Sequence, residues 1–405
     1  MLCLLSDIYG AVDNAQLTLL ALFDVSAAFD TVDHEILIKR LQISFGLSGN
    51  FLTWLGSFLS ERSLCVVHGP SRSLWVPAPY GLPQGSVLGP LLYIIYTSEI
   101  GSLLTASAVL GHLYADDVQA YLHCLAANAT AAVRTMSQAL GALEAWMSTN
   151  RLRLNPSKTQ FIWLGTRQQL AKLDLSTIAA DFPHFVFSSV VRDLGVTLDQ
   201  ELTLAPHVHR LCRDSYYQLR QLRTVARSLT PDATATLMHS FITVRLDYCC
   251  SLYVGLPACR SGCLNRVLRS AARLCGRIPK FGHVSAYMLD VLHWLPLLQW
   301  ISYRIITLVW RSLLGLAPAY LRDLCCPTSS AQGRRSLRST ERGVLMVPFA
   351  RTATKQNRAF SVVGPSLWNG LPLALRLHPR IHSESFYSCL KTVLFSRAGV
   401  GSAPE

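Results

Sequence analysis

Charged residues are scarce in this sequence: only 15% of its 405 residues are Asp, Glu, Lys or Arg, while 50% are hydrophobic. This composition excludes intrinsic disorder for the chain as a whole, because disordered chains combine low hydrophobicity with high charge. Long apolar runs are also lacking. The best candidates, residues 87–96 and 301–316, are too short or are broken by Pro90, Arg304 and Arg311, so no membrane-spanning segment is predicted.

A secretion signal is missing too, since the first ten residues, MLCLLSDIYG, contain no basic segment and include Asp7. We therefore expect a soluble, intracellular protein of the cytoplasm or nucleus. The twelve cysteines have irregular spacing, which favours reduced thiols over a disulfide framework. The nearest approach to a zinc-binding set is Cys259, Cys263, Cys275 and His283, but its spacing fits no compact zinc motif.

Acidic residues are few in the second half of the chain. Residues 203–405 contain 26 Lys and Arg against 8 Asp and Glu, a balance of +18, and 23 of the 26 are Arg. Residues 1–202 contain 11 against 16, a balance of −5. This asymmetry predicts one part that carries chemistry and another that binds a polyanion. The preference for Arg favours contacts with phosphates and bases over a general solubility charge.

Two predicted helices, residues 207–227 and 264–277, repeat Arg along one side and apolar residues along the other. Such stripes are usually solvated faces of helices that pack on a core. Because almost no acid interrupts them, nucleic-acid binding is favoured here. The arginines expected to make these contacts are Arg210, Arg213, Arg220, Arg266, Arg269 and Arg273.

The first half interleaves strands and helices without a regular period, which favours an α+β fold over a doubly wound sheet. An apolar strand ends at Asp24, helices are predicted at 33–45, 49–59 and 131–150, and a hairpin is predicted at 64–76. Beyond residue 203 the chain is predicted to be mostly helical, with a polar, basic linker at 327–345. The predicted regions are 1–202, 203–326 and 327–405.

Two adjacent aspartates, Asp116 and Asp117, lie inside the strand-like run HLYADDVQAYL. Buried or crowded carboxylates need compensation, and their oxygens suit a hard divalent cation such as Mg²⁺. Asp24, at the end of another apolar strand, supplies a third carboxylate. These residues suggest a two-metal phosphoryl-transfer site. A hairpin turn that merely contains Asp explains the pair equally well at this point.

The sequence resembles, motif by motif, the reverse transcriptases of non-LTR (LINE-type) retrotransposons. FDVSAAFDTVDH (23–34), GLPQGSVLGPLL (81–92), YADD (114–117), NPSKT (155–159) and DLGVTLD (193–199) are similar to five motifs of that family and occur in the family's order. Further stretches, LHWLPLLQWISYRI, GLAPAYLRDL and RAFSVVGPSLWNGLP, are typical of one group of LINE proteins. The resemblance therefore covers nearly the whole chain.

The resemblance implies a right-hand polymerase palm, an antiparallel sheet with helices on one face, followed by a thumb-like helical region and a C-terminal region. It implies RNA-directed DNA polymerisation, with an RNA template, a DNA primer, deoxynucleoside triphosphates and two Mg²⁺. Asp24 and Asp116 would be the main metal ligands, Asp117 a weaker partner and Lys158 the general acid for the pyrophosphate. The implied substrate contacts are Phe29 as the steric gate against a ribose 2′-OH, Gln84, Gly85 and Ser86 at the nucleotide and template, and Leu194 and Gly195 at the primer.

Other residues near these motifs are expected to have structural roles. Asp30, Asp33 and His34 suit capping and pairing at a helix start, and Tyr114 is expected to pack under the catalytic turn. The family has a fingers region before its first motif and usually an endonuclease further upstream. This sequence has only 23 residues before Asp24, so we expect a truncated copy that lacks both.

Two alternatives compete with the polymerase interpretation. An RNA-dependent RNA polymerase would place an acidic residue near the position of Phe29 and would use a second motif other than PQGS, so the sequence disfavours it. A non-catalytic remnant that binds nucleic acid through its Arg-rich half is the alternative from a different functional class. The sequence does not indicate the oligomeric state.

Overall fold

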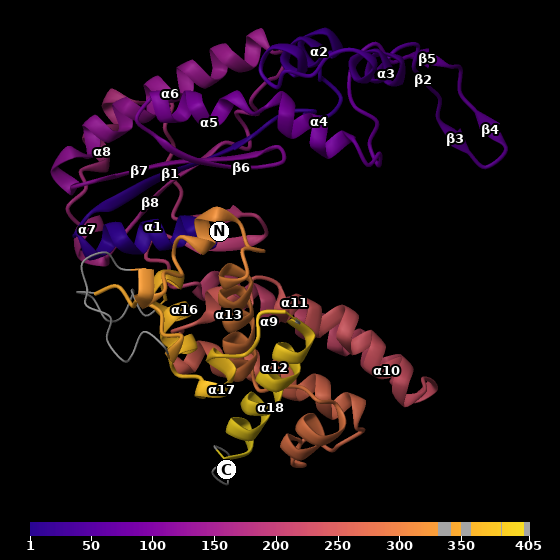
Figure 1. Cartoon of the computed structure of the whole chain (residues 1–405), viewed down its shortest axis with the longest axis vertical. Helices are drawn as coiled ribbons and strands as arrows, with labels where there is room; N and C mark the ends of the chain where they lie inside the picture. Colours follow the sequence, from indigo (N-terminus) through magenta and orange to yellow (C-terminus); the bar gives the residue numbers. More distant parts are fainter. Residues whose placement is uncertain (331–341, 350–357, 382, 401–405) are drawn as a thin grey trace. The chain divides into compact units, whose positions relative to one another are not determined.

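The computed structural model describes residues 1–330, 342–349, 358–381 and 383–400 (Figure 1). The chain forms two compact units. Residues 16–194 form the first, here called the sheet unit; residues 1–15 and those from 195 onward form the second, here called the helical unit. The predicted α+β class is confirmed. The predicted division into residues 1–202, 203–326 and 327–405 stays a prediction.

The sheet unit is built on four antiparallel strands in the order β6-β7-β1-β8. Their bounds are β1 Leu17–Asp24, β6 Leu110–Tyr114, β7 Asp117–Cys124 and β8 Gln160–Leu164. The central strand β1 is apolar along its length, as expected for a strand with neighbours on both sides. Its register with β7 places Asp24 directly opposite Asp117, so the ends of both strands bring acidic residues together.

Helices cover one face of this sheet (Figure 1). Alternate residues of β1, namely Leu17, Leu19, Ala21 and Phe23, enter a buried core with apolar residues of these helices. Because side chains alternate along a strand, Asp24 and Asp117 lie on the opposite face. The helices of this unit are α2 His34–Ile43, α3 Asn50–Leu59, α4 Gly89–Tyr96, α5 Glu99–Ala106, α6 Ala129–Thr149, α7 Arg167–Leu170 and α8 Leu175–Asp181.

The predicted helices at 33–45, 49–59 and 131–150 are confirmed, with ends that differ by at most two residues. The Asp33 carboxylate caps α2 by accepting hydrogen bonds from the backbone N–H of Glu35 and Ile36, which confirms its capping role.

A buried arginine of α2 joins this helix to three others. Arg40 of α2 is only 8% exposed and donates to the Glu99 carboxylate and to the Asn150 side-chain carbonyl, both at 2.8 Å. It also donates to the backbone carbonyl of Tyr96 and lies over the rings of Tyr96 and Trp146. The guanidinium therefore ties α2 to α4, α5 and the C-terminal end of α6.

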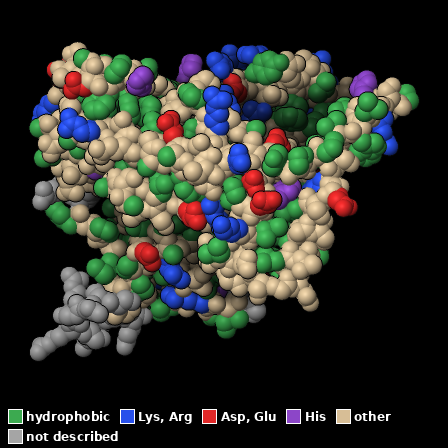
Figure 2. All heavy atoms as spheres, turned by 90° about the horizontal axis from the view of Figure 1, so that it is seen from above, with side chains coloured by type: hydrophobic (Ala, Val, Ile, Leu, Met, Phe, Trp, Pro, Cys, Tyr) green, Lys and Arg blue, Asp and Glu red, His purple; other side chains and the backbone are tan. Residues whose placement is uncertain are grey.

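The predicted hairpin at 64–76 is present as two short antiparallel ladders, β2–β5 and β3–β4. Their bounds are β2 Ser63–Leu64, β3 Val67–His68, β4 Ser71–Arg72 and β5 Val76–Pro77. Apolar side chains here are exposed, Leu74 by 88%. Figure 2 shows hydrophobic, basic and acidic side chains intermixed over the face seen from above.

The helical unit contains the predicted helices at 207–227 and 264–277, which overlap α9 and α12 and were each predicted to end two residues too late. Its described elements are α1 Leu2–Asp13, β10 Val196–Asp199, α9 Ala205–Val225, α10 Pro231–Met238, α11 Val244–Asp247, α12 Ala258–Cys275, α13 Leu297–Leu313, α14 Ala319–Arg322, α16 Phe360–Asn369, α17 Leu373–Arg376 and α18 Ser383–Val400. In the described part of the chain, no helix combines the length and apolarity needed to cross a membrane.

An aromatic cluster organises the C-terminal helices of this unit. Trp310 of α13 stacks on Phe386 of α18 with ring centroids 4.0 Å apart, and Trp368 of α16 lies 6.3 Å from Trp310. These three rings are almost fully buried, and aromatic burial of this kind dominates core stability. Part of the predicted linker at 327–345, residues 331–341, lies outside the described residues; Pro327 and Leu345 form a β-bridge.

Candidate active site

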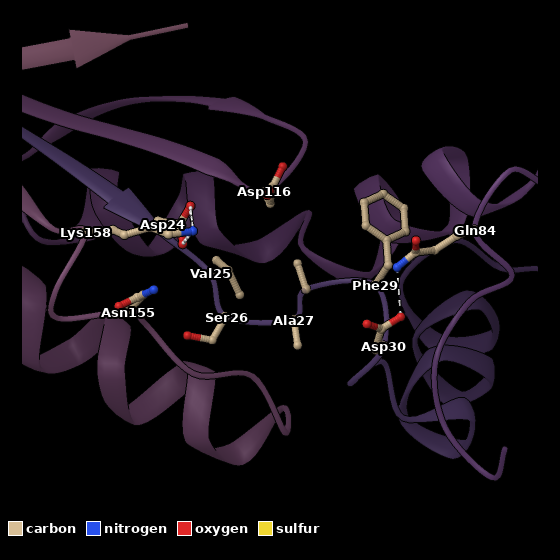
Figure 3. Close-up of a pocket in the computed structure, with 11 residues that line it drawn as sticks. Asp24, Val25, Ser26, Ala27, Phe29, Asp30, Gln84, Asp116, Asn155 and Lys158 are labelled. Carbon is tan, nitrogen blue, oxygen red and sulfur yellow. Dashed lines mark hydrogen bonds and ion pairs between the residues drawn. The ribbon is translucent and has the colours of Figure 1, made fainter. Parts of the chain in front are cut away.

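The end of strand β1 opens into a cleft of about 370 Å³ (Figure 3). A volume of this size is in the range of small-molecule sites. The cleft lies wholly within the sheet unit. Its lining residues are Asp24, Val25, Ser26, Ala27, Ala28, Phe29, Asp30, Gln84, Asp116, Asn155 and Lys158.

The segment after Asp24 is held along the cleft by the turn that follows α6. The Asp24 carbonyl accepts a hydrogen bond from the Asn155 backbone N–H at 2.8 Å, and the Ser26 N–H donates to the Arg153 carbonyl at 2.8 Å. Ala27 has a φ of +49°, a left-handed conformation that is uncommon for a residue with a side chain. These bonds set the direction in which the segment leaves the sheet.

Asp116 reaches the same cleft from a two-residue turn between β6 and β7. Ala115, the first residue of this turn, has a φ of +53°. Strained backbone of this kind costs roughly 1–3 kcal/mol and clusters at functional sites. Figure 3 shows Asp116 above the Val25–Ala27 segment, between Asp24 and Phe29.

Asp117, the first residue of β7, does not line the cleft but faces Asp24 across the strand pair. Burial raises the pKa of Asp117, and the nearby carboxylates of Asp116 and Asp24 raise this pKa further, while Lys158 lowers it. Like charges directly opposite each other are destabilising in a sheet. Because a cation would relieve this repulsion, the three carboxylates are candidate ligands of a divalent cation, although their oxygens do not all lie within 4.8 Å of one another in this structure.

Lys158 provides one positive charge beside these acids. Its ammonium lies 3.1 Å from the Asp24 carboxylate, and its side chain is 64% exposed (Figure 3). The turn that carries it is fixed by Asn155, whose side chain accepts hydrogen bonds from the Ser157 N–H and hydroxyl. Lys158 is thus held at the mouth of the cleft, near the strand end that carries Asp24.

The GLPQGS loop packs directly against the backbone that follows Phe29. Gly81 has a φ of +87°, and a Cβ added to it would lie 2.9 Å from the Asp30 carbonyl oxygen. The Gly81 N–H donates to the Val32 carbonyl and the Leu82 N–H to the Phe29 carbonyl, both at 2.8 Å. The His34 ring Nε2 lies 2.7 Å from the Gly81 carbonyl oxygen, which confirms a structural role for His34. Only glycine fits this contact.

Two further contacts orient the side chains at this end of the cleft. The Gln84 amide donates to the Asp30 carboxylate at 3.0 Å (Figure 3). Phe29 stacks on Tyr93 of α4, with ring centroids 4.8 Å apart and an interplanar angle of 23°. Tyr93 is 1% exposed, so the ring beneath Phe29 is fixed by the core.

The structure thus gathers Asp24, Phe29, Gln84, Asp116 and Lys158 in one cleft. Gly85 and Ser86 do not line it: Gly85 has a φ of +83°, and the Ser86 hydroxyl accepts the Gly89 N–H at the start of α4. Leu194 and Gly195 also lie outside it. They join β9, Val190–Asp193, to β10, and both have positive φ, +43° and +81°.

One prediction about this site is wrong. Tyr114 is 66% exposed and does not pack under the turn that carries Asp116. As the last residue of β6, an edge strand, it has a strand neighbour on one side only. Asp30, predicted to be structural, also lines the cleft.

Sequence reasoning did not assign Asn155 to the cleft or identify Gly81 as a close-contact glycine. Both lie inside motifs that were identified, NPSKT and GLPQGS. The sequence therefore places both residues in recognisable motifs. It does not predict their contacts, because these depend on pairing between segments that are distant in sequence.

The arginines predicted to bind nucleic acid differ in the groups that surround them. Arg210 and Arg213 approach Asp214 at 3.8 and 3.4 Å. Arg266 approaches the Cys263 sulfur at 3.0 Å, and Arg269 lies on the same helix, α12. Arg220 and Arg273 line a second cavity, within the helical unit.

Comparison with known proteins identifies relatives of about half of the chain. Residues 3–198 match the family model described as "Reverse transcriptase (RNA-dependent DNA polymerase)". The "Probable RNA-directed DNA polymerase from transposon BS" of Drosophila melanogaster is 31% identical over 224 residues, which are 53% of this chain and 24% of that protein. The "RNA-directed DNA polymerase from mobile element jockey" of the same species is 27% identical over 203 residues, 49% of this chain and 21% of that protein.

The chain spans about a quarter of the length of the curated relatives that it matches. The matched region contains the cleft, the aspartates and the GLPQGS loop. Residues 3–198 of this chain therefore belong to the reverse transcriptase family, and its relatives are polymerases of LINE-type, non-LTR elements.

Proposed function

We propose that this chain carries the catalytic part of an RNA-directed DNA polymerase, which adds deoxynucleotides to a primer 3′-OH on an RNA template. The observation that carries this proposal is the meeting of Asp24 and Asp116, 92 residues apart in sequence, in one cleft with Phe29 and Gln84. Reverse transcriptases use divalent metal ions, and here we propose two Mg²⁺.

Asp24 and Asp116, which line the cleft, would be the main metal ligands, and Asp117, which does not line it, would be a weaker partner. Bound metal would favour ionisation of the 3′-OH and stabilise charge on the pyrophosphate. The 3′-OH gives its proton to water, its oxygen forms a bond to the α-phosphorus, and the bond from that phosphorus to its bridging oxygen breaks, so that pyrophosphate leaves with the electron pair of that bond.

Lys158 would give its proton to the leaving pyrophosphate. Its ammonium is paired with Asp24 at 3.1 Å, and it can turn toward the pyrophosphate once cations neutralise that carboxylate. Because the Lys158 side chain is largely exposed, this movement needs no repacking.

The remaining roles concern substrate selection. Phe29, supported from below by Tyr93, would exclude the ribose 2′-OH, and Gln84, held by Asp30, would contact the nucleotide. Gly85 and Ser86 would lie along the template, and Leu194 and Gly195 would hold the primer. The arginines of α9 and α12 would bind nucleic acid.

Primer extension on an RNA template tests the proposal. An Asp116→Asn/Asp117→Asn variant should lose at least about a hundredfold in extension rate, because the metal ligands are removed. A matched control, Glu144→Gln/Asp181→Asn, removes two exposed acids of the same unit outside the cleft and should extend like the parent chain. Equal extension by the parent and the Asp116/Asp117 variant would refute the polymerase proposal.

A second candidate is a nucleic-acid-binding protein without polymerase activity. The balance of +18 in residues 203–405 favours it. In that case the chain would bind RNA with a steep loss of affinity as salt rises, yet neither the parent nor the control would extend a primer.

A further inference from the structure

A second cavity lies in the helical unit, between α9 and α12 and the turn that follows α12. Its volume is about 880 Å³, and we call it the α9–α12 groove. Its lining residues are Tyr216, Leu219, Arg220, Arg223, Ala226, Arg227, Ser270, Arg273, Leu274, Arg277, Ile278 and Lys280.

The charge of this groove has one sign. Six of the described residues that line it are Arg or Lys and none is acidic. Two of its guanidiniums are positioned by backbone carbonyls: Arg273 donates to Gly282 at 3.4 Å and Arg277 to Leu229 at 3.3 Å. Because a guanidinium has five N–H donors, each retains donors for a ligand.

The other arginines of the same helices lie in a different environment. Arg210 and Arg213 share the Asp214 carboxylate, which partly neutralises them. The groove contains no such acid among its described lining residues. The two helices therefore carry two kinds of arginine, and the groove concentrates those suited to an anionic ligand.

The shape of the groove favours a single strand over a duplex. α9 and α12 pack directly on each other, so the groove is a narrow furrow along their shared surface, lined by side chains of both helices. Between the cations lie an aromatic ring, Tyr216, which is 36% exposed, and the apolar side chains of Leu219, Leu274 and Ile278. A duplex presents mainly phosphates to such a floor, whereas a single strand also presents base faces.

We propose that the α9–α12 groove binds a single-stranded stretch of nucleic acid, with phosphates on its arginines and a base on Tyr216. This deepens, and rests on, the nucleic-acid binding proposed above. An acidic polypeptide would satisfy the charge of the groove, but it would leave the aromatic and apolar floor without a stacking partner.

The test measures binding of the full chain to an unstructured oligouridylate of about 12 nucleotides, a length within the usual range for one such site. The groove variant is Arg220→Gln/Arg223→Gln/Arg273→Gln. The matched control, Arg245→Gln/Arg311→Gln/Arg322→Gln, removes the same charge from exposed arginines of the helical unit that lie outside the groove and outside α9 and α12. Circular dichroism spectra establish that both variants fold.

We expect the groove variant to lose at least about tenfold in affinity and its salt slope to become shallower by about 2, since each lost phosphate contact removes roughly 0.7. The control should change affinity by less than about threefold. Tyr216→Ala, which keeps every charge, should lower affinity for oligouridylate by about tenfold through lost stacking. The same substitution should leave duplex binding unchanged.

Equal losses in the groove and control variants would overturn the proposal, because they would indicate a general surface charge. Binding of a duplex as tight as that of the single strand would overturn it too. Poly-glutamate that competes as well as RNA would identify an acidic protein as the partner instead. Asp116→Asn/Asp117→Asn should bind oligouridylate normally, so a failed extension assay and a failed groove remain distinguishable.

Discussion

The sheet unit concentrates negative charge at one point, whereas the helical unit spreads positive charge along two helices. Strand register brings Asp24 opposite Asp117, and a tight turn places Asp116 next to them. On α9 and α12, by contrast, helical periodicity places arginines along a face several turns long. Strand pairing thus unites residues that are distant in sequence, while a helix alone only aligns nearby ones.

The two arrangements also differ in electrostatic cost. Burial, and then the nearby carboxylates of Asp116 and Asp24, raise the pKa of Asp117 in the sheet unit, so ionising this carboxyl is less favourable in the folded state. Most α9 and α12 arginines are exposed and individually contribute little to stability. A charge in the sheet unit should therefore affect stability more than one on α9. Four predictions, from the largest expected effect to the smallest, test this comparison.

Arg40→Met should destabilise the protein most, by roughly 3–5 kcal/mol, since it removes a buried guanidinium that donates to the Asn150 side-chain carbonyl and pairs with Glu99, which would keep only the Trp146 indole N–H as a donor. Urea unfolding measures this change. Arg134→Met, an exposed arginine of α6, is the matched control and should shift stability by less than about 0.5 kcal/mol. Equal losses of stability in the two variants would show that burial of Arg40 does not increase its contribution to the free energy of unfolding.

Gly81→Ala should cost about 3 kcal/mol and reduce primer extension strongly, because its Cβ would meet the Asp30 backbone at 2.9 Å. Gly46→Ala shares the positive φ, +67°, but has nothing within 4 Å of the added Cβ. This control should cost only about 1 kcal/mol and leave extension intact. Similar losses of stability and extension in both variants would mean that strain from the positive φ, and not the contact with Asp30, causes the effect.

Asp193 tests the cost of negative charge in the sheet unit through pH. Burial raises the pKa of Asp193 to about 6, although the Gln119 amide donates to this carboxylate at 2.7 Å. The folded state therefore holds a proton more tightly than the unfolded state, for which the reference pKa is 3.8. Stability should fall by about 2 kcal/mol as pH rises from about 4 to about 6, and remain at that lower level above pH 6.

Unfolding in urea at several pH values measures this loss. In Asp193→Asn the component of the pH dependence between about 4 and 6 should disappear, since Asn does not ionise, while the exposed control Asp181→Asn should retain it. An unchanged slope in Asp193→Asn would assign the effect to other carboxylates.

Asp214→Asn should have the smallest effect on stability, below about 0.5 kcal/mol, because its pairs with Arg210 and Arg213 are partly exposed. It should raise RNA affinity about twofold by removing a negative charge beside two arginines. Unfolding and binding assays on the same preparation check both values. A loss of RNA affinity would show that Asp214 orients those arginines for binding.

Much of the sheet unit was predictable because its motifs are local and ordered. The strand that ends at Asp24, the capped helix after Asp33 and the turn that carries Asp116 each follow from a few neighbouring residues. Asn155, Gly81 and the exposure of Tyr114 were not predictable in the same way. Their environments depend on which strand or loop lies beside them, and a single sequence does not predict which segments pair.

The helical unit was predictable only as helices. The arginine stripes on α9 and α12 followed from periodicity, but the separation of groove arginines from those paired with Asp214 did not. The aromatic cluster of Trp310, Trp368 and Phe386 was likewise not predicted, because its members come from three helices. Side chains on different helices come into contact only when the helices pack, and the periodicity of the sequence does not predict which helices pack together.

The sequence by itself determined the chemical identity of the site: the aspartates, the PQGS loop and the NPSKT turn, in an order that specifies a polymerase family. It also determined the charge asymmetry between the two halves. Only the tertiary structure decided that Lys158 pairs with Asp24, that Gly81 contacts Asp30, and which arginines share a groove. The physical reason is that residue type and local periodicity are properties of the chain, whereas repulsion, desolvation and close contact depend on distances that only folding sets.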